Sequence, residues 1–338
     1  MEQNVDKKGK LLLSVKDVEV RYETKDEVVH AVNDVSFDLN YGETLGLVGE
    51  TGAGKTTIAR TILRILPTPP AKFVKGEVWF DGQNLYDLKE EEMRQIRGGR
   101  ISMVFQDPMT ALNPVKRVGW QIAEAIRYHS DVSKKEADAR AIEMLKLVGI
   151  SPDRFREYPH QFSGGMKQRV VIAIALACNP KLLLADEPTT ALDVTIQAQV
   201  LDMMISLKQK MDTSMIFITH DLGIVAEICD EVAVMYAGRI IERGNLDEVF
   251  NHTKHPYTEG LFNSLPDIDN RTSELHPIPG LMPDPTKLPK GCAFAPRCPY
   301  ARPECIETPQ VEKHFSETHT VMCSAYQDPN FRIRREEG

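Results

Sequence analysis

Eight consecutive residues near the start of the chain have the types and spacing of a phosphate-binding loop. They fit the pattern G-x-x-x-x-G-K-S/T at every fixed position: Gly49, Glu50, Thr51, Gly52, Ala53, Gly54, Lys55 and Thr56. Glycines let successive backbone N–H groups converge on phosphate oxygens, and a helix that begins near Lys55 adds the positive end of its dipole. The loop therefore predicts a nucleoside triphosphate, with Lys55 on the β- and γ-phosphates, Thr56 on Mg²⁺, and Thr57 continuing the helix.

Two carboxylates follow an apolar run later in the chain. Asp186 and Glu187 come directly after Leu182–Ala185. Asp186 is expected to hold Mg²⁺ directly or through water, and Glu187 to be the general base or the group that orients water for attack on the γ-phosphate. An apolar run followed by Asp-Glu is a weak pattern alone, but it becomes specific when a phosphate-binding loop is present in the same chain.

A second anion site is predicted where Ser163, Gly164 and Gly165 open a helix, because the first N–H groups and the dipole of a helix attract anions. This helix tip cannot easily reach the nucleotide held by its own loop. Head-to-tail dimerisation would aim it at the γ-phosphate bound by the partner. The plainer alternative is a Ser/Gly helix cap with no ligand.

The surrounding pattern predicts an α/β fold built around these motifs. Alternating segments over 12–22, 28–39 and 76–82 indicate a mostly antiparallel sheet, and apolar runs over 100–106, 181–185 and 215–219 indicate buried strands. Helical periodicity between Gln121 and Ile150, with Ser133 and Glu136 as a capping box, indicates an inserted helical subdomain over about residues 107–178. Residues 231–243 resemble a hairpin that turns at Ala237-Gly238.

Composition narrows the class of protein. The 338 residues carry 41 Lys+Arg against 49 Asp+Glu, a net charge of −8, so the overall positive field that drives nonspecific nucleic-acid binding is missing. No apolar run approaches the roughly 20 residues needed to span a bilayer, and the N-terminus lacks the apolar core of a signal peptide. These features predict a cytosolic protein that does not bind nucleic acid.

The C-terminal part has a different character from about residue 251 onwards. Prolines interrupt any long helix or strand there, so we expect no ordinary core and a need for a covalent or metal staple. Four cysteines cluster in this part: Cys292, Cys298, Cys305 and Cys323. Their irregular spacing lacks the close pairs of zinc sites, and a disulfide is unusual in a reducing cytosol. We expect a 4Fe-4S cluster, ahead of zinc and of four free thiols.

Taken together, the loop, the Asp-Glu pair and Phe162-Ser163-Gly164-Gly165-Met166 resemble the ATP-binding cassette (ABC) family over residues 12–250. The resemblance implies a P-loop cassette with an antiparallel β subdomain, an inserted helical subdomain and a Pro/Cys-rich extension over 251–338. It also implies individual roles. Tyr22 stacks on adenine, Gln106 senses Mg²⁺ and the transmembrane partner, Asp193 crosses the dimer interface, and His220 is the switch histidine.

Longer stretches resemble the dipeptide, oligopeptide and nickel importer branch of that family. They include residues 105–114, 187–197 and His255-Pro256-Tyr257-Thr258, and the cysteine region resembles the branch's cluster-binding extension. This resemblance implies ATP, Mg²⁺ and a 4Fe-4S cluster as cofactors. It further implies a second ATPase subunit, two permease subunits and an extracytoplasmic binding protein as partners, at the cytoplasmic face of the membrane. One alternative is an importer ATPase for nickel or another small solute. Another is a soluble ABC ATPase that takes no part in transport.

Overall fold

The computed structural model describes residues 9–190, 192–265 and 277–336, which divide into two compact units. The first unit comprises the chain up to Leu13, Leu39–Thr44 and Trp79–Ile218; the second comprises Ser14–Asp38, Leu45–Val78 and Thr219 onwards. The chain passes between the units several times. The predicted phosphate-binding loop therefore belongs to the second unit, whereas the Asp186-Glu187 pair belongs to the first.

The first unit has three parallel strands in the order β8-β7-β6 and a group of helices. Its helices and strands are β5 (Gln83–Asn84), α2 (Glu90–Ile96), β6 (Ile101–Val104), α3 (Pro108–Ala111), α4 (Val118–His129), α5 (Lys134–Leu147), α6 (Gly164–Leu176), β7 (Leu182–Asp186), α7 (Val194–Met211) and β8 (Ser214–Thr219). Every residue of β6, β7 and β8 is buried, as expected for strands covered on both faces.

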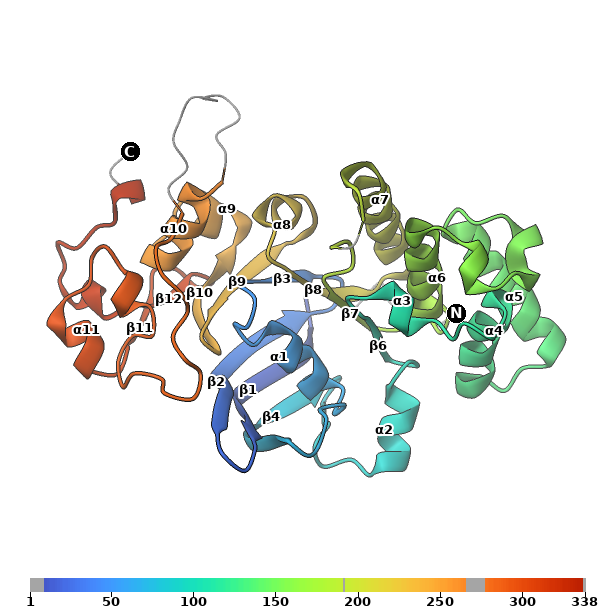
Figure 1. The fold of residues 1–338 in the computed structure, drawn as a ribbon, viewed down its shortest axis with the longest axis horizontal. Coiled ribbons are helices and arrows are strands. Elements are labelled where there is room, and N and C mark those ends of the chain that lie inside the picture. Colours follow the sequence, from blue (N-terminus) through green and yellow to red (C-terminus); the bar gives the residue numbers. More distant parts are fainter. Residues whose placement is uncertain (1–8, 191, 266–276, 337–338) are drawn as a thin grey trace. The chain divides into compact units, whose positions relative to one another are not determined.

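Helices α4, α5 and α6 form the green and olive group in Figure 1. The sequence predicts helical structure from Gln121, and the first long helix begins at Val118, three residues earlier. Ser133 caps α5 by accepting the Glu136 N–H at 3.2 Å. The Glu136 carboxylate pairs with Arg140 one turn further on.

The second unit holds two sets of strands, in the orders β2-β1-β4 and β11-β12-β10-β9-β3. Its helices and strands are β1 (Leu11–Glu23), β2 (Val28–Asn40), β3 (Thr44–Val48), α1 (Lys55–Ile62), β4 (Ala71–Phe80), α8 (Leu222–Ile228), β9 (Glu231–Tyr236), β10 (Arg239–Asn245), α9 (Leu246–Phe250), α10 (Pro256–Asn263), α11 (Pro303–Glu307), β11 (Glu312–His314) and β12 (Thr320–Met322). The hairpin predicted at Ala237-Gly238 is confirmed: β9 and β10 are antiparallel, and both turn residues have positive φ.

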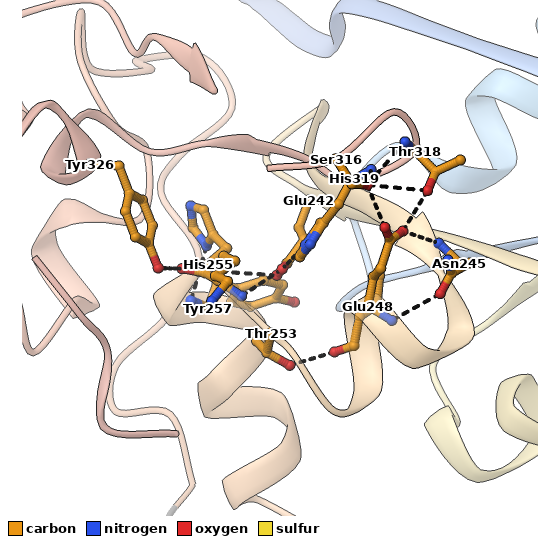
Figure 2. A network of polar contacts seen from close by, with 12 residues as sticks. Glu242, Asn245, Glu248, Thr253, His255, Tyr257, Ser316, Thr318, His319 and Tyr326 are labelled. Atoms are coloured by element: carbon orange, nitrogen blue, oxygen red, sulfur yellow. Dashed lines mark hydrogen bonds and ion pairs between the residues drawn. The ribbon is translucent and has the colours of Figure 1, made fainter. Parts of the chain in front are cut away.

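The C-terminal extension packs against β10 and α9, as the orange and red elements of Figure 1 show. Strand β12 pairs with β10, with Val321 opposite Glu242. The Glu242 carboxylate is fully buried and lies 2.9 Å from Nε2 of His319, and Figure 2 shows this contact within a larger polar network. The Glu248 carboxylate accepts hydrogen bonds from Ser316 and Thr318.

The expectation that this extension has no ordinary core is wrong. Aromatic and aliphatic residues near the C-terminus form a buried apolar cluster: Val321, Ala325, Tyr326, Phe331 and Ile333, with Tyr300, Phe315 and Cys323 packed against it. The rings of Phe315, Tyr326 and Phe331 meet edge to face at 4.8 and 4.9 Å. These residues follow the proline-rich stretch, so the prolines shape loops around a core that they do not interrupt. In the described part of the chain, no helix has the length and apolar character needed to cross a membrane.

Candidate nucleotide-binding site

The predicted phosphate-binding loop lies between strand β3 and helix α1 in the second unit. The turn depends on glycine at both ends. Gly49 has φ +153°, and a Cβ there would clash with the carbonyl oxygen of Met235 on β9. Gly54 has φ +102°, and its Cβ would lie 2.5 Å from the carbonyl oxygen of Ala31. Other residue types would therefore be excluded by strain and by contact with neighbouring backbone.

The Lys55 ammonium is buried inside the loop that it closes. Lys55 is only 5 % exposed, and its Nζ donates to the carbonyl oxygens of Gly49 at 2.6 Å and Glu50 at 3.1 Å. A buried ammonium needs such acceptors, and phosphate oxygens are stronger ones because they carry charge. The loop thus holds a cation in position to exchange carbonyl partners for phosphate oxygens.

Two further predicted residues lie in the same unit. The Tyr22 hydroxyl at the end of β1 lies 3.4 Å from Oγ1 of Thr57 on α1, which places this aromatic side chain beside the loop helix. His220 follows β8 directly and is exposed, and Asp221 next to it caps α8 by accepting the N–H groups of Gly223 and Ile224. Thr51 is exposed and Thr56 is half-buried.

The predicted carboxylates stand at the end of β7 in the first unit. Asp186 is 3 % exposed, whereas Glu187 is half-buried. Glu187 has φ +45°, a left-handed conformation that is uncommon for a residue with a long side chain. Its N–H donates to the carbonyl oxygen of Ile218 at the end of β8 at 2.9 Å, which holds this backbone conformation in place.

Gln106 and Glu187 are 81 positions apart in sequence and meet in the structure. Nε2 of Gln106 donates to Oε2 of Glu187 at 2.8 Å, and the Thr190 hydroxyl donates to the same oxygen at 3.0 Å. Both donors are neutral, so they orient the carboxylate without neutralising it. The sequence pattern singles out Gln106 and Glu187 but gives no signal for Thr190.

Helix α6 begins at the predicted serine-glycine motif. The Ser163 hydroxyl accepts the Met166 N–H at 3.4 Å and caps the helix. A Cβ at Gly165 would lie 2.5 Å from Cγ2 of Ile196 on α7, whereas among the described residues a Cβ at Gly164 would meet open space. Asp193 caps α7 by accepting the Ile196 N–H at 3.0 Å. Both helix tips are therefore capped by a side chain, and they lie close to each other where Gly165 meets Ile196.

The donor set of the predicted magnesium site is chemically consistent with that ion. Thr56 offers a hydroxyl oxygen, Asp186 a buried carboxylate and Gln106 an amide oxygen, all of them hard oxygen ligands of the kind that Mg²⁺ prefers. Thr56 belongs to the second unit and the other two belong to the first.

The prediction of an iron–sulfur cluster needs correction. Within residues 9–190, 192–265 and 277–336, no group of three or more His, Cys, Asp or Glu side chains is placed to hold a metal ion. The predicted ligands are free thiols that line one small cavity together with Phe294 and Ala325: Cys292, Cys298, Cys305 and Cys323. Burial raises the pKa of Cys298 and of Cys323 to about 12 and so favours the neutral thiol.

Comparison with known proteins agrees with this geometry. Residues 32–190 match the family model described as "ABC transporter", and residues 241–305 match the model described as "Oligopeptide/dipeptide transporter, C-terminal region". The chain is 52 % identical to the oligopeptide transport ATP-binding protein OppD of Bacillus subtilis, over 92 % of this chain and 87 % of that protein. It is 50 % identical to the dipeptide transport ATP-binding protein DppD of the same organism, over 92 % of this chain and 94 % of that protein.

A solved structure extends the likeness to the fold. The dimeric ATP-binding cassette MJ0796 bound to ADP and Pi superposes with a TM-score of 0.63 at 28 % identity, covering 70 % of this chain and 99 % of that one. The chain therefore belongs to the ABC transporter family of ATP-binding proteins, and to the branch that carries the oligopeptide/dipeptide transporter C-terminal region.

Proposed function

We propose that this chain is the ATP-hydrolysing subunit that powers import of dipeptides or oligopeptides through an ABC transporter. The main support is identity of about one half, over nearly the whole chain, to ATP-binding proteins named for oligopeptide and dipeptide transport. Residues 12–250 form the ATPase cassette in this proposal, with the helical subdomain over about 107–178. Residues 251–338 form the extension typical of the branch.

The phosphate-binding loop and Tyr22 bind the nucleotide in this account. Lys55 leaves its carbonyl partners and takes β- and γ-phosphate oxygens, while Tyr22 stacks on adenine. Thr56, Asp186 and Gln106 would hold Mg²⁺, which would offset the negative charge of the phosphates. The oxygen chemistry of these side chains supports the assignment.

Glu187 acts as the general base that orients and deprotonates the attacking water. Its carboxylate is oriented for this role by neutral donors from Gln106 and Thr190. His220 contacts the γ-phosphate as the switch residue. Gln106 also faces the permease, so that loading of the nucleotide site is transmitted to the membrane subunits.

A second ATPase subunit completes each site. Ser163, Gly164 and Gly165 at the tip of α6 bind the γ-phosphate held by the partner subunit, and Asp193 contacts that partner. Binding of ATP closes the two subunits and hydrolysis reopens them. The partners are a second ATPase subunit, two permease subunits and an extracytoplasmic binding protein, and the chain is attached peripherally at the cytoplasmic face of the membrane.

Transport in reconstituted vesicles tests this function. The complete transporter should take up labelled tripeptide when ATP is supplied on the side of this subunit, and Lys55→Ala should abolish uptake because the main phosphate-binding cation is lost. Labelled nickel supplied in a parallel experiment should not accumulate. Uptake of nickel without uptake of peptide would contradict the proposed substrate class.

A further inference from the structure

The C-terminal extension contacts the phosphate-binding loop through a part-buried ion pair. Nη1 of Arg297 lies 3.1 Å from both carboxylate oxygens of Glu50, the second residue of the loop. The Arg297 side chain is only 7 % exposed, and the two residues are 247 positions apart in the chain. A charge pair of this kind interacts more strongly than one on the surface because water screens it less.

Arg297 is held by several other acceptors of the second unit. Its Nε donates to the carbonyl oxygen of Pro279 at 2.8 Å, and Nη2 donates to that of Ile278 at 3.4 Å. Nη1 also donates to the Tyr236 hydroxyl at 3.3 Å. Burial alone would lower the pKa of Arg297, but its bonds to Tyr236 and Glu50 raise it. The guanidinium is thus a fixed positive charge beside the loop.

A second residue of the extension holds the backbone of Glu50. The Tyr257 hydroxyl on α10 accepts the Glu50 N–H at 3.1 Å. Tyr257 is fully buried, and its ring lies 4.6 Å from that of Tyr236 and 5.3 Å from that of Phe294, measured between centroids. This packing leaves the hydroxyl little freedom to leave the loop.

The start of α10 is fixed in turn by the buried carboxylate of Glu242, as Figure 2 shows. Glu242 accepts the N–H of Lys254 at 2.7 Å and that of His255 at 3.1 Å. Nδ1 of His255 accepts the Tyr257 N–H at 3.0 Å, and burial lowers the pKa of His255 to about 3, so the ring stays neutral. A continuous set of contacts therefore runs from β10 through α10 to the loop.

Every polar group of Glu50 has a partner as a result. The carboxylate is bound by Arg297, the N–H by Tyr257, and the carbonyl oxygen by Lys55 together with the Ala53 N–H. The side chain of Met282 also lies over the middle of the loop, with its Cε 3.8 Å from a Cβ built at Gly52. The extension thus fixes the entry of the loop and offsets its one acidic side chain.

We propose that Arg297 and Tyr257 are positioning residues for the nucleotide site: they hold Glu50 so that the loop keeps its phosphate-binding shape and its carboxylate does not repel the triphosphate. The proposal rests on the proposed nucleotide function of the loop. Neither residue touches the nucleotide in this account. The extension thereby sets the affinity of the cassette for ATP, a role separate from substrate recognition.

Equilibrium binding of fluorescent mant-ATP with Mg²⁺ to the full chain tests this role. Arg297→Gln should raise the Kd about 10-fold at low salt, because Glu50 then carries an uncompensated charge beside the triphosphate. The loss should shrink between about 0.05 M and 0.5 M salt as that repulsion is screened. Arg297→Lys keeps the charge and should recover part of the affinity. Tyr257→Phe, which removes only the hydroxyl, should raise the Kd about threefold.

The double variant Glu50→Gln/Arg297→Gln separates positioning from mere folding. Removal of both charges should return the Kd to within about threefold of the original protein, a rescue that damage to the extension could not produce. Arg302→Gln serves as the matched control, because Arg302 pairs with Asp328 inside the extension, and it should leave the Kd unchanged. Thermal midpoints measured alongside show that each variant is folded.

Two results would overturn the inference while the original protein still binds mant-ATP: unchanged affinity in both Arg297→Gln and Tyr257→Phe, or a double variant that binds no better than Arg297→Gln. Failure of the original protein to bind the probe would instead contradict the proposed function itself. That outcome would remove the basis of the inference as well.

Discussion

At the scale of single residues, the backbone of Glu187 is held in a left-handed conformation that residues other than glycine rarely adopt. Its φ of +45° costs backbone energy, on the order of 1 kcal/mol or more, which the bond from its N–H to Ile218 helps to offset. Gln106 and Thr190 then fix the side chain. The backbone and two side-chain hydrogen bonds together define the direction in which this carboxylate points.

Removal of Gln106 tests whether this orientation matters. Gln106→Ala should lower the kcat for ATP hydrolysis by about 10-fold, because Glu187 loses the hydrogen bond donated by Gln106 and the predicted magnesium site loses an oxygen ligand. The KM for ATP should change less than kcat. The measurement is steady-state phosphate release with the partner subunit, with Gln199→Ala as control because Gln199 is an exposed glutamine on α7. Equal activity of both variants would show that Gln106 does not position the base.

The sequence alone identifies most of these residues but not how they are held. In the sequence, Glu187 and Gln106 each follow a predicted strand. These strands, β7 and β6, are parallel neighbours in the structure, so their carboxyl ends lie side by side. Thr190 and the positive φ of Glu187 leave no such signal, because a hydroxyl three residues away and a strained backbone depend on local three-dimensional packing.

At the scale of secondary structure, one carboxylate connects the residues that precede strands β6 and β7. Asp81 in the turn after β4 accepts hydrogen bonds from Tyr41, Arg100 and Lys181, the last at 2.6 Å. Arg100 precedes β6 and Lys181 precedes β7. Although burial opposes it, bonds to Lys181 and Tyr41 lower the pKa of Asp81 below its ordinary value of 3.8.

Asp81→Asn should therefore destabilise the first unit by about 1–3 kcal/mol at neutral pH, because cationic partners lose a part-buried carboxylate. The pKa of Asp81 is lower in the folded protein than in the unfolded chain. Its carboxylate therefore stabilises the fold fully above the unfolded-state pKa, and this stabilisation is lost as the pH falls through the folded-state pKa. Thermal unfolding between about pH 6 and pH 2 should show a steeper loss in the original protein than in Asp81→Asn. Asp202→Asn on the exposed side of α7 is the control. Parallel curves for Asp81→Asn and the original protein would contradict the assignment.

Secondary structure is predictable where the signal is local. The β9–β10 turn and the Ser133 cap follow from two or three neighbouring residues. The apolar core of the extension is missed because its members are spread over 300–333 and interleaved with loops, so no periodicity marks them. The cysteine cluster is misassigned for a related reason: spacing shows that the four thiols can gather around one cavity, but not whether they are placed to hold a metal ion, and in the described part of the chain they are not.

At the scale of the whole molecule, the extension is a working part of the nucleotide-binding unit in this account. Its contact with the loop joins residues 247 positions apart, and no sequence pattern predicts such a pair from a single chain. Family comparison predicts the presence of both segments, while only the structure brings Glu50 and Arg297 together. Transport would then depend on segments outside the catalytic motifs.

The central claim is that this chain binds ATP and hydrolyses it with Glu187 as the base, and Glu187→Gln tests it most directly. The variant, combined with its partner subunit, should bind MgATP with the affinity of the original protein and remain associated with the partner in light-scattering measurements. Its phosphate release should fall by about 100-fold or more, because the glutamine amide cannot accept the proton from water. Phosphate release at the original rate would contradict the account.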